Sequence, residues 1–123
     1  MLIYEVAERY NSIQKKMGVS EKSSWINDID DLFTEDFTKV INGQTIVNNR
    51  ASLSNQILSC IETAGSWVIE EKDIIPSSCN QKCTIRYIIK TQKGGSFDVI
   101  AILSSDKNNK ILKIDEICYQ IEN

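Results

Sequence analysis

The amino-acid sequence predicts an α+β domain in which three helices, all from the N-terminal half, pack on the concave face of a cone-shaped, strongly curved antiparallel sheet. Helical periodicity is confined to the first 64 residues, and four alternating segments separated by turn sequences fill the remainder. Helices followed by consecutive strands favour an antiparallel sheet covered on one face. No repeat, linker or low-complexity tract interrupts the sequence, so we expect residues 1–123 to form a single domain.

The first helix is expected over residues 3–17, because apolar side chains recur there at steps of three and four residues. Gly18 is expected to end this helix, since glycine is common just past a helix C-terminus. The apolar stripe places Tyr10 toward the sheet, either as a hydroxyl offered to a ligand or as a core tyrosine with a satisfied hydroxyl. The stripe consists of Ile3, Val6, Tyr10, Ile13 and Met17.

A second helix is expected over residues 25–34, with Ser24 as its N-cap. Its cluster of aspartates invites a calcium interpretation, but an EF-hand loop needs a glycine at its sixth position and a glutamate at its twelfth. Neither falls in place, so we interpret the aspartates as a solvated helix face. Trp25 begins this helix and is a candidate for the roof of a cavity, with packing in the core or at the rim as the alternative.

A short strand, a third helix and four further strands complete the predicted order. The short strand covers residues 37–41, and the Asn-Gly pair that follows it marks a turn. The third helix is expected over residues 50–64, closed by Gly65. The last strands are expected over residues 66–75, 83–91, 96–104 and 110–121. The first of them ends at Pro76, because proline cannot donate to a strand ladder.

Strand alternation assigns side chains to the two faces of the sheet. Tyr87 should face the helices and Arg86 should point away, unless a one-residue bulge exchanges them. Trp67 and Ile69 line either the inner face or a dimer face. The other inward residues are expected to be Cys83, Ile85, Ile89, Phe97, Val99, Ala101 and Leu103. In the closing strand one face carries Leu112, Ile114, Glu116 and Cys118, and the other carries Ile111, Lys113, Asp115, Ile117, Tyr119 and Ile121.

The charge and hydropathy of the chain exclude several classes of partner. The net charge of −3 and the scattered lysines provide no basic stripe for phosphates, so no nucleic-acid partner is expected. No apolar run approaches the roughly 20 residues of a membrane span, so no membrane partner is expected. The opening MLIYEVAERY acquires charge by Glu5 and lacks the pattern of a signal peptide. We therefore expect a cytoplasmic protein.

The four cysteines are expected to be reduced thiols rather than metal ligands. A structural zinc site normally has four ligands, often arranged as two close pairs. Only Cys79 and Cys83 lie close together in the sequence, Cys60 and Cys118 are isolated, and the chain has no histidine. The sequence therefore predicts no metal and no cofactor.

Three stretches carry a resemblance to a known family. VAERYNSIQKKMG resembles the family's opening helix, and GGSFDVIAILSSDKNNKILKIDEICY resembles its closing hairpin. LFTEDFTKVINGQTIVNNRASLSNQI resembles the segment of helix, short strand, turn and third helix, with Arg50 near the start of that helix. In this order they resemble the nuclear transport factor 2-like superfamily, and within it the SnoaL-like and ketosteroid-isomerase-like branch. The resemblance implies a cone-shaped fold, an internal pocket for a small molecule and homodimers through the outer face of the sheet.

The resemblance supplies only part of a catalytic set. Ketosteroid-isomerase-like chemistry uses a carboxylate base near the end of the first short strand, with a tyrosine and a protonated aspartic acid as oxyanion donors. Tyr10 matches the tyrosine, but the base falls within residues 40–42 and the acid at Ala101, where no carboxylate stands. The histidine base of SnoaL-like cyclases is absent, and Arg86 lacks the converging aspartates of the epoxide-hydrolase relatives. Catalysis by a family mechanism is therefore not expected.

Three functions remain open from the sequence. The leading interpretation is a domain that binds a small hydrophobic or aromatic molecule in an apolar pocket without transforming it. The alternatives are an isomerase, lyase or hydrolase with Glu116 as acid or base and Tyr10 as hydrogen-bond donor, and a protein-interaction module that uses the sheet face. The predicted pocket residues are Tyr10, Trp25, Tyr87, Phe97, Ala101, Ile114, Glu116 and Cys118. The predicted face of a homodimer consists of Ile117, Tyr119 and Ile121.

Overall fold

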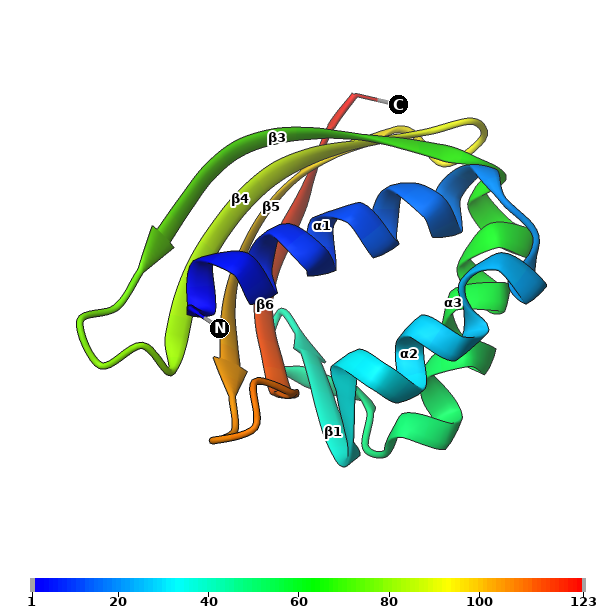
Figure 1. Cartoon of the computed structure of the whole chain (residues 1–123). Helices are drawn as coiled ribbons and strands as arrows, with labels where there is room; N and C mark the ends of the chain where they lie inside the picture. Colours follow the sequence, from blue (N-terminus) through cyan, green and yellow to red (C-terminus); the bar gives the residue numbers. More distant parts are fainter. Residues whose placement is uncertain (1, 123) are drawn as a thin grey trace.

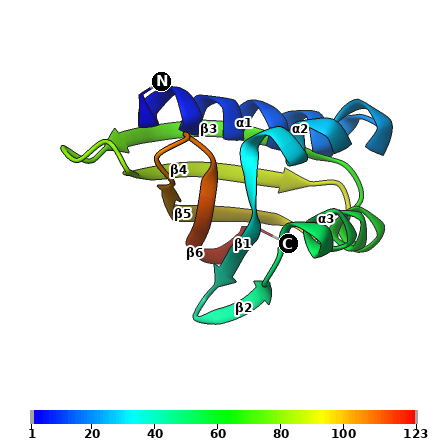
Figure 2. The same cartoon turned by 60° about the horizontal axis from the view of Figure 1, so that its bottom comes forward.

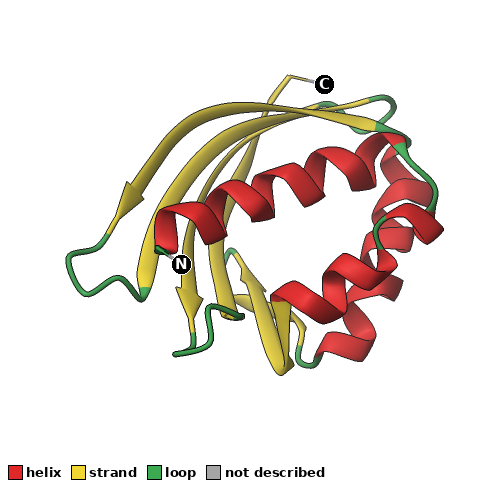
Figure 3. Ribbon diagram, viewed as in Figure 1, coloured by secondary structure: helices red, strands yellow, loops and turns green. Residues whose placement is uncertain are grey.

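The computed structural model of the protein describes residues 2–122, which form three α-helices, a short 3₁₀ turn and six strands (Figure 1). The strands form one sheet that arches around the helices, so that its concave face is turned toward them (Figure 3). The α+β fold class predicted from the sequence is therefore confirmed. The elements are α1 (Ile3–Val19), the 3₁₀ turn (Lys22–Ser24), α2 (Ile26–Leu32), β1 (Phe33–Ile41), β2 (Gln44–Val47), α3 (Arg50–Ala64), β3 (Trp67–Pro76), β4 (Lys82–Thr91), β5 (Ser96–Ser105) and β6 (Ile111–Glu122).

The helices cover the sheet at two places. α1 packs along β3 and β4, whereas α3 packs against β1 and β2 (Figure 2). The short helix α2 contacts both α3 and β1 and so joins the two regions. Among the described residues no helix is long and apolar enough to cross a membrane. Between these two regions the concave face of the sheet is not covered by a helix and forms one wall of an internal space.

The sheet is mixed rather than wholly antiparallel, which corrects one part of the prediction. Its strand order is β2-β1-β6-β5-β4-β3. Consecutive strands from β3 to β6 pair antiparallel, but the closing strand β6 returns beside β1 and runs parallel to it. This contact joins two segments that are far apart in the chain, so no local sequence pattern announces it.

The second helix is shorter than predicted and the first strand is longer. α2 ends at Leu32 and β1 begins directly at Phe33. Both side chains are fully buried, and Phe33 pairs with Ile111 of β6. Pairing with a distant strand therefore outweighs the helical pattern of this segment. Ser24 does not cap α2, because it lies within the 3₁₀ turn and Trp25 occupies the N-cap position.

The strand β2 was missed by the sequence analysis, which recognised only the turn before it. Asn42 and Gly43 have positive φ angles of 51° and 81°, as a tight two-residue hairpin turn requires. Of the four residues of β2 only Val47 is buried, so the segment shows no alternation of apolar and polar side chains. The Asn-Gly pair was the signal from which the hairpin could have been inferred.

Close contacts fix α1 on the sheet at both of its ends. The helix continues past Gly18, which corrects the predicted helix end. A Cβ atom on Gly18 would lie 2.5 Å from the carbonyl oxygen of Trp67, so the close approach of α1 to β3 requires glycine here. The Trp67 indole Nε1 donates to the carbonyl of Gln14 at 2.9 Å. At the other end, the backbone N–H of Ile3 donates to Oδ1 of Asn80 at 2.8 Å.

An irregularity at the start of β6 changes the face of one predicted residue. Ser104 pairs with Lys113 and Ser105 pairs with Ile111, so Leu112 has no partner across the ladder. As a result Ile111 is buried and Leu112 is exposed, the reverse of the prediction. Beyond the irregularity the predicted alternation is confirmed. Ile114 and Glu116 are buried, whereas Ile117, Tyr119 and Ile121 are exposed.

Candidate functional site

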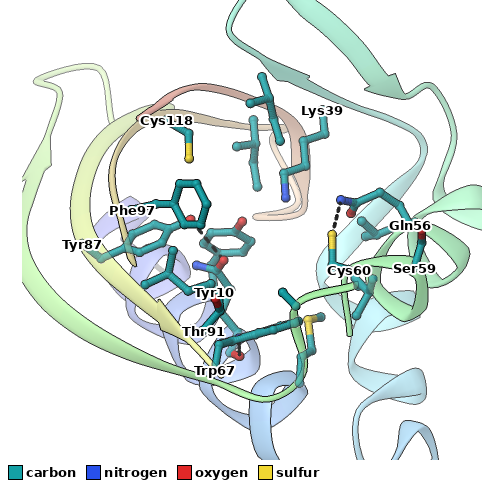
Figure 4. Close-up of a pocket in the computed structure, with 18 of the residues that line it drawn as sticks. Tyr10, Lys39, Gln56, Ser59, Cys60, Trp67, Tyr87, Thr91, Phe97 and Cys118 are labelled. Atoms are coloured by element: carbon teal, nitrogen blue, oxygen red, sulfur yellow. Dashed lines mark hydrogen bonds between the residues drawn. The ribbon is translucent and has the colours of Figure 1, made fainter. Parts of the chain in front are cut away.

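A cavity of about 390 Å³ lies between α1, α3 and the concave face of the sheet (Figure 4). Most of its wall is apolar, and edge-to-face contacts order the aromatic part, with ring centroids 6.1 Å apart for Tyr10 and Phe33 and 4.7 Å apart for Phe33 and Phe37. The volume is in the range that small-molecule sites occupy. The apolar wall consists of Met17, Phe33, Phe37, Ile41, Leu53, Ile57, Ala64, Trp67, Ile89, Phe97 and Ile114.

The helix α3 contributes a polar rim to the cavity. Gln56, Ser59, Cys60 and Thr63 line the cavity from successive turns of this helix. Figure 4 shows Gln56 and Cys60 on the side opposite Tyr87 and Phe97, with Gln56 Nε2 donating to the Cys60 sulfur at 3.1 Å. Because the side chains of Ser59, Cys60 and Thr63 are also exposed to solvent, we place the entrance to the cavity along this helix.

Two tyrosines and a glutamine form the polar group on the α1 side of the cavity. The Tyr87 hydroxyl donates to Gln14 Oε1 at 3.1 Å, which leaves Gln14 Nε2 buried without a hydrogen-bond partner. Burial raises the pKa of Tyr10 to about 12, partly offset by the nearby Lys39 ammonium. Burial also raises the pKa of Tyr87 well above its ordinary value. Both hydroxyls are therefore protonated at neutral pH and able to donate.

Lys39 brings a positive charge into this apolar space. It lies on β1, is partly buried, and extends its amine into the cavity (Figure 4). Burial is the largest single effect and would lower the pKa of Lys39, but the charge of Glu116, together with smaller contributions from Tyr10, Cys60 and Cys118, raises the pKa above its ordinary value. The raised pKa favours the ammonium form of Lys39 at neutral pH and so disfavours its use as a nucleophilic amine.

Glu116 lies beside the cavity rather than in its wall. Its side chain is 5% exposed, and Oε2 is buried without a hydrogen-bond partner among the described residues. It pairs with Ala101 of β5 on one side and Ile41 of β1 on the other, so it lies in the central strand of the concave face. Two opposite charges, those of Lys39 and Glu116, are therefore held in one largely apolar region.

Five of the eight predicted pocket residues line the cavity, namely Tyr10, Tyr87, Phe97, Ile114 and Cys118. The other three, Trp25, Ala101 and Glu116, are buried outside the described wall. Trp25 is in the core at the start of α2 instead of forming a roof.

Lys39 and Gln14 are two of the polar wall residues that the sequence did not reveal, as are Gln56, Ser59, Cys60, Thr63 and Thr91. A lysine in a short strand is ordinarily a surface charge, so its residue type gave no reason to place it inside. The alternation of Phe37, Lys39 and Ile41 was the available signal, since all three line the cavity. Gln14 lies one helical turn after Tyr10, at a spacing that puts both side chains on the same face of α1.

Asn42 joins the end of β1 to β6 by hydrogen bonds, close in sequence to Lys39 and in contact with the backbone of Glu116. Its Nδ2 donates to the Cys118 carbonyl and its Oδ1 accepts from the Cys118 N–H, both at 2.9 Å. Its own backbone N–H donates to the Glu116 carbonyl at 2.9 Å. The side chain thereby continues the ladder beyond the end of β1. It positions the strand segment that carries Glu116 and Cys118.

Arg86 and Asp98 form an ion pair on the convex face, away from the cavity. Arg86 Nε donates to Oδ1 at 3.1 Å and Nη2 to Oδ2 at 2.7 Å, and the Tyr119 hydroxyl donates to Oδ2 at 3.4 Å. The hydrogen bonds from Arg86 lower the pKa of Asp98. Arg86 points away from the helices, as predicted. It contributes to the convex surface rather than to the chemistry of the cavity.

Metal binding is not indicated by the side chains on the concave face. Within residues 2–122 no group of three or more histidine, cysteine, aspartate or glutamate side chains is arranged to hold a metal ion. The polar side chains of the cavity wall carry one ammonium, two amides, two thiols and several hydroxyls. This set matches hydrogen-bond acceptors and negative charge on a ligand better than it matches a cation.

Comparison with known proteins identifies the fold. No protein-family model and no curated protein matches the sequence. A solved NTF2-like protein of unknown function from Exiguobacterium sp. 255-15 superposes with a TM-score of 0.76 at 16% identity, covering 93% of this chain and 98% of that one. A protein described as a SnoaL-like polyketide cyclase from Jannaschia sp. CCS1 gives 0.75 at 7% identity, with 92% and 84% covered.

A third solved structure extends the likeness to another branch. A protein with a ketosteroid isomerase-like fold from Catenulispora acidiphila DSM 44928, in complex with trimethylamine, superposes with a TM-score of 0.73 at 14% identity. The match covers 95% of this chain and 86% of that one. Identities this low establish the fold and not the activity. The chain has the nuclear transport factor 2-like fold, which confirms the resemblance seen in the sequence.

Proposed function

We propose that this protein binds a small, largely apolar molecule in the cavity between α1, α3 and the sheet. The main observation in support of this proposal is an internal space of about 390 Å³. Its wall is mainly aliphatic and aromatic, with a few polar groups on the α1 and β1 sides as well as on the α3 rim. Such a wall favours transfer of an apolar ligand from water, and the polar groups orient it. A structural neighbour in complex with a small molecule, trimethylamine, supports this use of the fold.

The neutral fluorophore N-phenyl-1-naphthylamine tests the proposal, because its emission rises when it leaves water. Ile57 lines the cavity from α3, and a larger side chain there should occupy the ligand's space. We expect saturable binding by the native chain and a loss of about tenfold or more in affinity for Ile57→Trp. Leu58→Trp is the matched control, since Leu58 is exposed on the same helix and does not line the cavity.

Two results would contradict the binding proposal. The first is the absence of saturable fluorescence with the native chain. The second is an equal loss of affinity in Ile57→Trp and Leu58→Trp, which would trace the signal to the surface of α3. Circular dichroism of both variants establishes that they remain folded before their affinities are compared.

Proton transfer on the bound molecule is a second candidate function. The observation that favours it is the buried Glu116 carboxylate with an unpartnered Oε2, close to the Lys39 ammonium and the Tyr10 hydroxyl. A carboxylate base near groups that can donate to a carbonyl oxygen is suited to removing a hydrogen next to that carbonyl.

Hydrogen exchange in D₂O tests this second function. Cyclohexanone is a neutral ketone whose α-hydrogens are visible by NMR. If Glu116 acts as a base, the native chain accelerates their exchange and Glu116→Gln does not. Exchange at the same rate in the two proteins would contradict the catalytic proposal and leave the binding proposal in place.

A further inference from the structure

Lys39 is the single charged side chain among the described residues that line the cavity. Its neighbours in the wall are chiefly aliphatic and aromatic, so its charge is weakly solvated. Within residues 2–122 no carboxylate oxygen lies within 4.0 Å of its ammonium. A charge presented in this way, without a partner in contact, interacts strongly with a counter-charge that enters the cavity.

Two other polar groups of the cavity wall, Gln14 and Tyr10, can also donate hydrogen bonds. Gln14 Nε2 is buried without a partner, because the amide oxygen of that side chain accepts from Tyr87. The Tyr10 hydroxyl remains protonated at neutral pH and lines the same cavity. An ammonium, an amide N–H and a phenolic O–H together require acceptors on the ligand, and the ammonium favours an acceptor that carries negative charge.

Glu116 does not itself serve as the acceptor that the Lys39 ammonium requires. Its carboxylate lies on β6 outside the described cavity wall, and its oxygens form no ion pair within 4.0 Å of the Lys39 ammonium. Glu116 keeps Lys39 charged while the ammonium itself faces the cavity. Its negative charge also opposes that of an incoming anion, so the arrangement predicts opposite effects for the two residues on anion affinity.

We propose that the molecule held in this cavity is an organic monoanion, with an apolar body and one carboxylate or phenolate group that pairs with Lys39. The inference rests on the proposed binding function and adds the chemical class of the ligand. The apolar wall accommodates the body, and Gln14 and Tyr10 offer hydrogen bonds to the anionic end. Organic cations are disfavoured, because the ammonium of Lys39 repels them in a space of low polarity.

Two fluorophores with the same aromatic body test the inference. 8-Anilino-1-naphthalenesulfonate carries a sulfonate, which stands in for the carboxylate, and N-phenyl-1-naphthylamine lacks it. In Lys39→Met we expect affinity for the anionic probe to fall roughly 10- to 100-fold, as for loss of a charge-assisted hydrogen bond. Affinity for the neutral probe should stay the same or rise. Lys113→Met is the control. Lys113 is exposed on β6, so this substitution removes the same charge from the surface instead of from the cavity.

Glu116→Gln gives the second arm of the experiment. Removal of the opposing carboxylate charge should raise affinity for the anionic probe severalfold and leave affinity for the neutral probe unchanged. Lower affinity of this variant for the anionic probe would overturn the proposed arrangement, since Glu116 would then assist the anion.

The remaining outcomes separate this inference from the binding function on which it rests. Binding of both probes with no change in Lys39→Met overturns the ligand class and leaves the binding function standing. An equal loss of affinity in Lys39→Met and Lys113→Met also overturns the ligand class, because surface charge then explains the effect. If the native chain binds neither probe, both proposals fall.

Discussion

Tyr10 shows at the scale of one residue how burial changes chemistry. Its ring packs edge-on against Phe33 while its hydroxyl lies near Lys39, Glu116 and Tyr87. The sequence left open whether this tyrosine faces a ligand or packs in the core, and in the structure it is packed in the core beside the cavity. It is buried in the protein and also lines the cavity.

The raised pKa of Tyr10 predicts a loss of stability at alkaline pH. The unfolded chain ionises this hydroxyl near pH 10, whereas burial raises the pKa in the folded state to about 12. The contribution of Tyr10 to the free energy of unfolding is complete below the unfolded pKa and is lost as pH rises through the folded one. It amounts to about 3 kcal/mol at most.

Urea unfolding across that pH range measures the effect. The free energy of unfolding of Tyr10→Phe should fall less steeply with pH than that of the native chain, because phenylalanine has no hydroxyl to ionise. Equal slopes for the two proteins would show that the tyrosine hydroxyl does not contribute to the alkaline loss of stability.

At the scale of elements, the contact between β1 and β6 decides the shape of the site. The two strands run parallel and bring Lys39 and Glu116 onto the same face of the sheet. Asn42 closes this contact at its open end through three hydrogen bonds to the backbone of β6. Substitution of Asn42 should therefore first weaken the hydrogen bonding of the strand segment that carries Glu116.

Asn42→Ala should lower the free energy of unfolding by about 1–2 kcal/mol, because it loses two side-chain hydrogen bonds and keeps a positive φ. The Cys118 amide, which donates to Asn42 Oδ1, should exchange its hydrogen faster. Asn42→Gly removes the same hydrogen bonds without backbone strain. It should therefore match Asn42→Ala in Cys118 exchange and lose less stability.

Amide hydrogen exchange followed by NMR, together with urea unfolding, makes this comparison. If the Cys118 amide exchanges at the native rate in both variants, the side chain of Asn42 is not what protects the end of β6. The proposed positioning of Glu116 by Asn42 would then be withdrawn.

At the scale of the whole molecule, the convex face of the sheet carries an apolar surface on two neighbouring strands. Ile117 and Tyr119 on β6 are 65% and 56% exposed, and Ile121 lies further along the same face. Ile100 of β5 is also exposed and pairs directly with Ile117. An exposed apolar surface of this kind commonly marks an interface.

We propose that a second copy of the chain covers this convex face. Two identical apolar faces related by a two-fold axis are complementary, and the Arg86–Asp98 pair beside them is internally neutralised. Sedimentation velocity should show a dimer at micromolar concentration for the native chain. Ile117→Asp should be a monomer, because it places a charge at the centre of the face.

Val19→Asp is the control for the dimer experiment, since Val19 is exposed at the end of α1, on the helical side of the sheet. It should sediment as the native chain does. A native chain that is monomeric at micromolar concentration contradicts the homodimer. The convex face would then be available to a different protein, as in the interaction module that the sequence left open.

Local patterns in the sequence determined the class of fold and most of its elements. The stripe from Ile3 to Met17, the alternation around Tyr87 and the closing alternation from Ile114 onward all depend on residues within one element. Each such pattern arises because a helix or strand packed on one side buries the apolar side chains of that single face. The inward positions expected for Tyr10 and Tyr87 follow from these patterns, and both side chains are buried.

Only the tertiary structure decided which side chains meet. The parallel contact of β6 with β1, the strand β2 and the exchange of Ile111 with Leu112 all depend on pairing between distant segments. The position of Lys39 inside an apolar cavity depends on the same pairing, because a lysine is ordinarily solvated and its residue type predicts the surface. The sequence alone therefore predicted a cone-shaped fold with an apolar interior. The long-range register of its strands is what places the charge of Lys39 inside that interior.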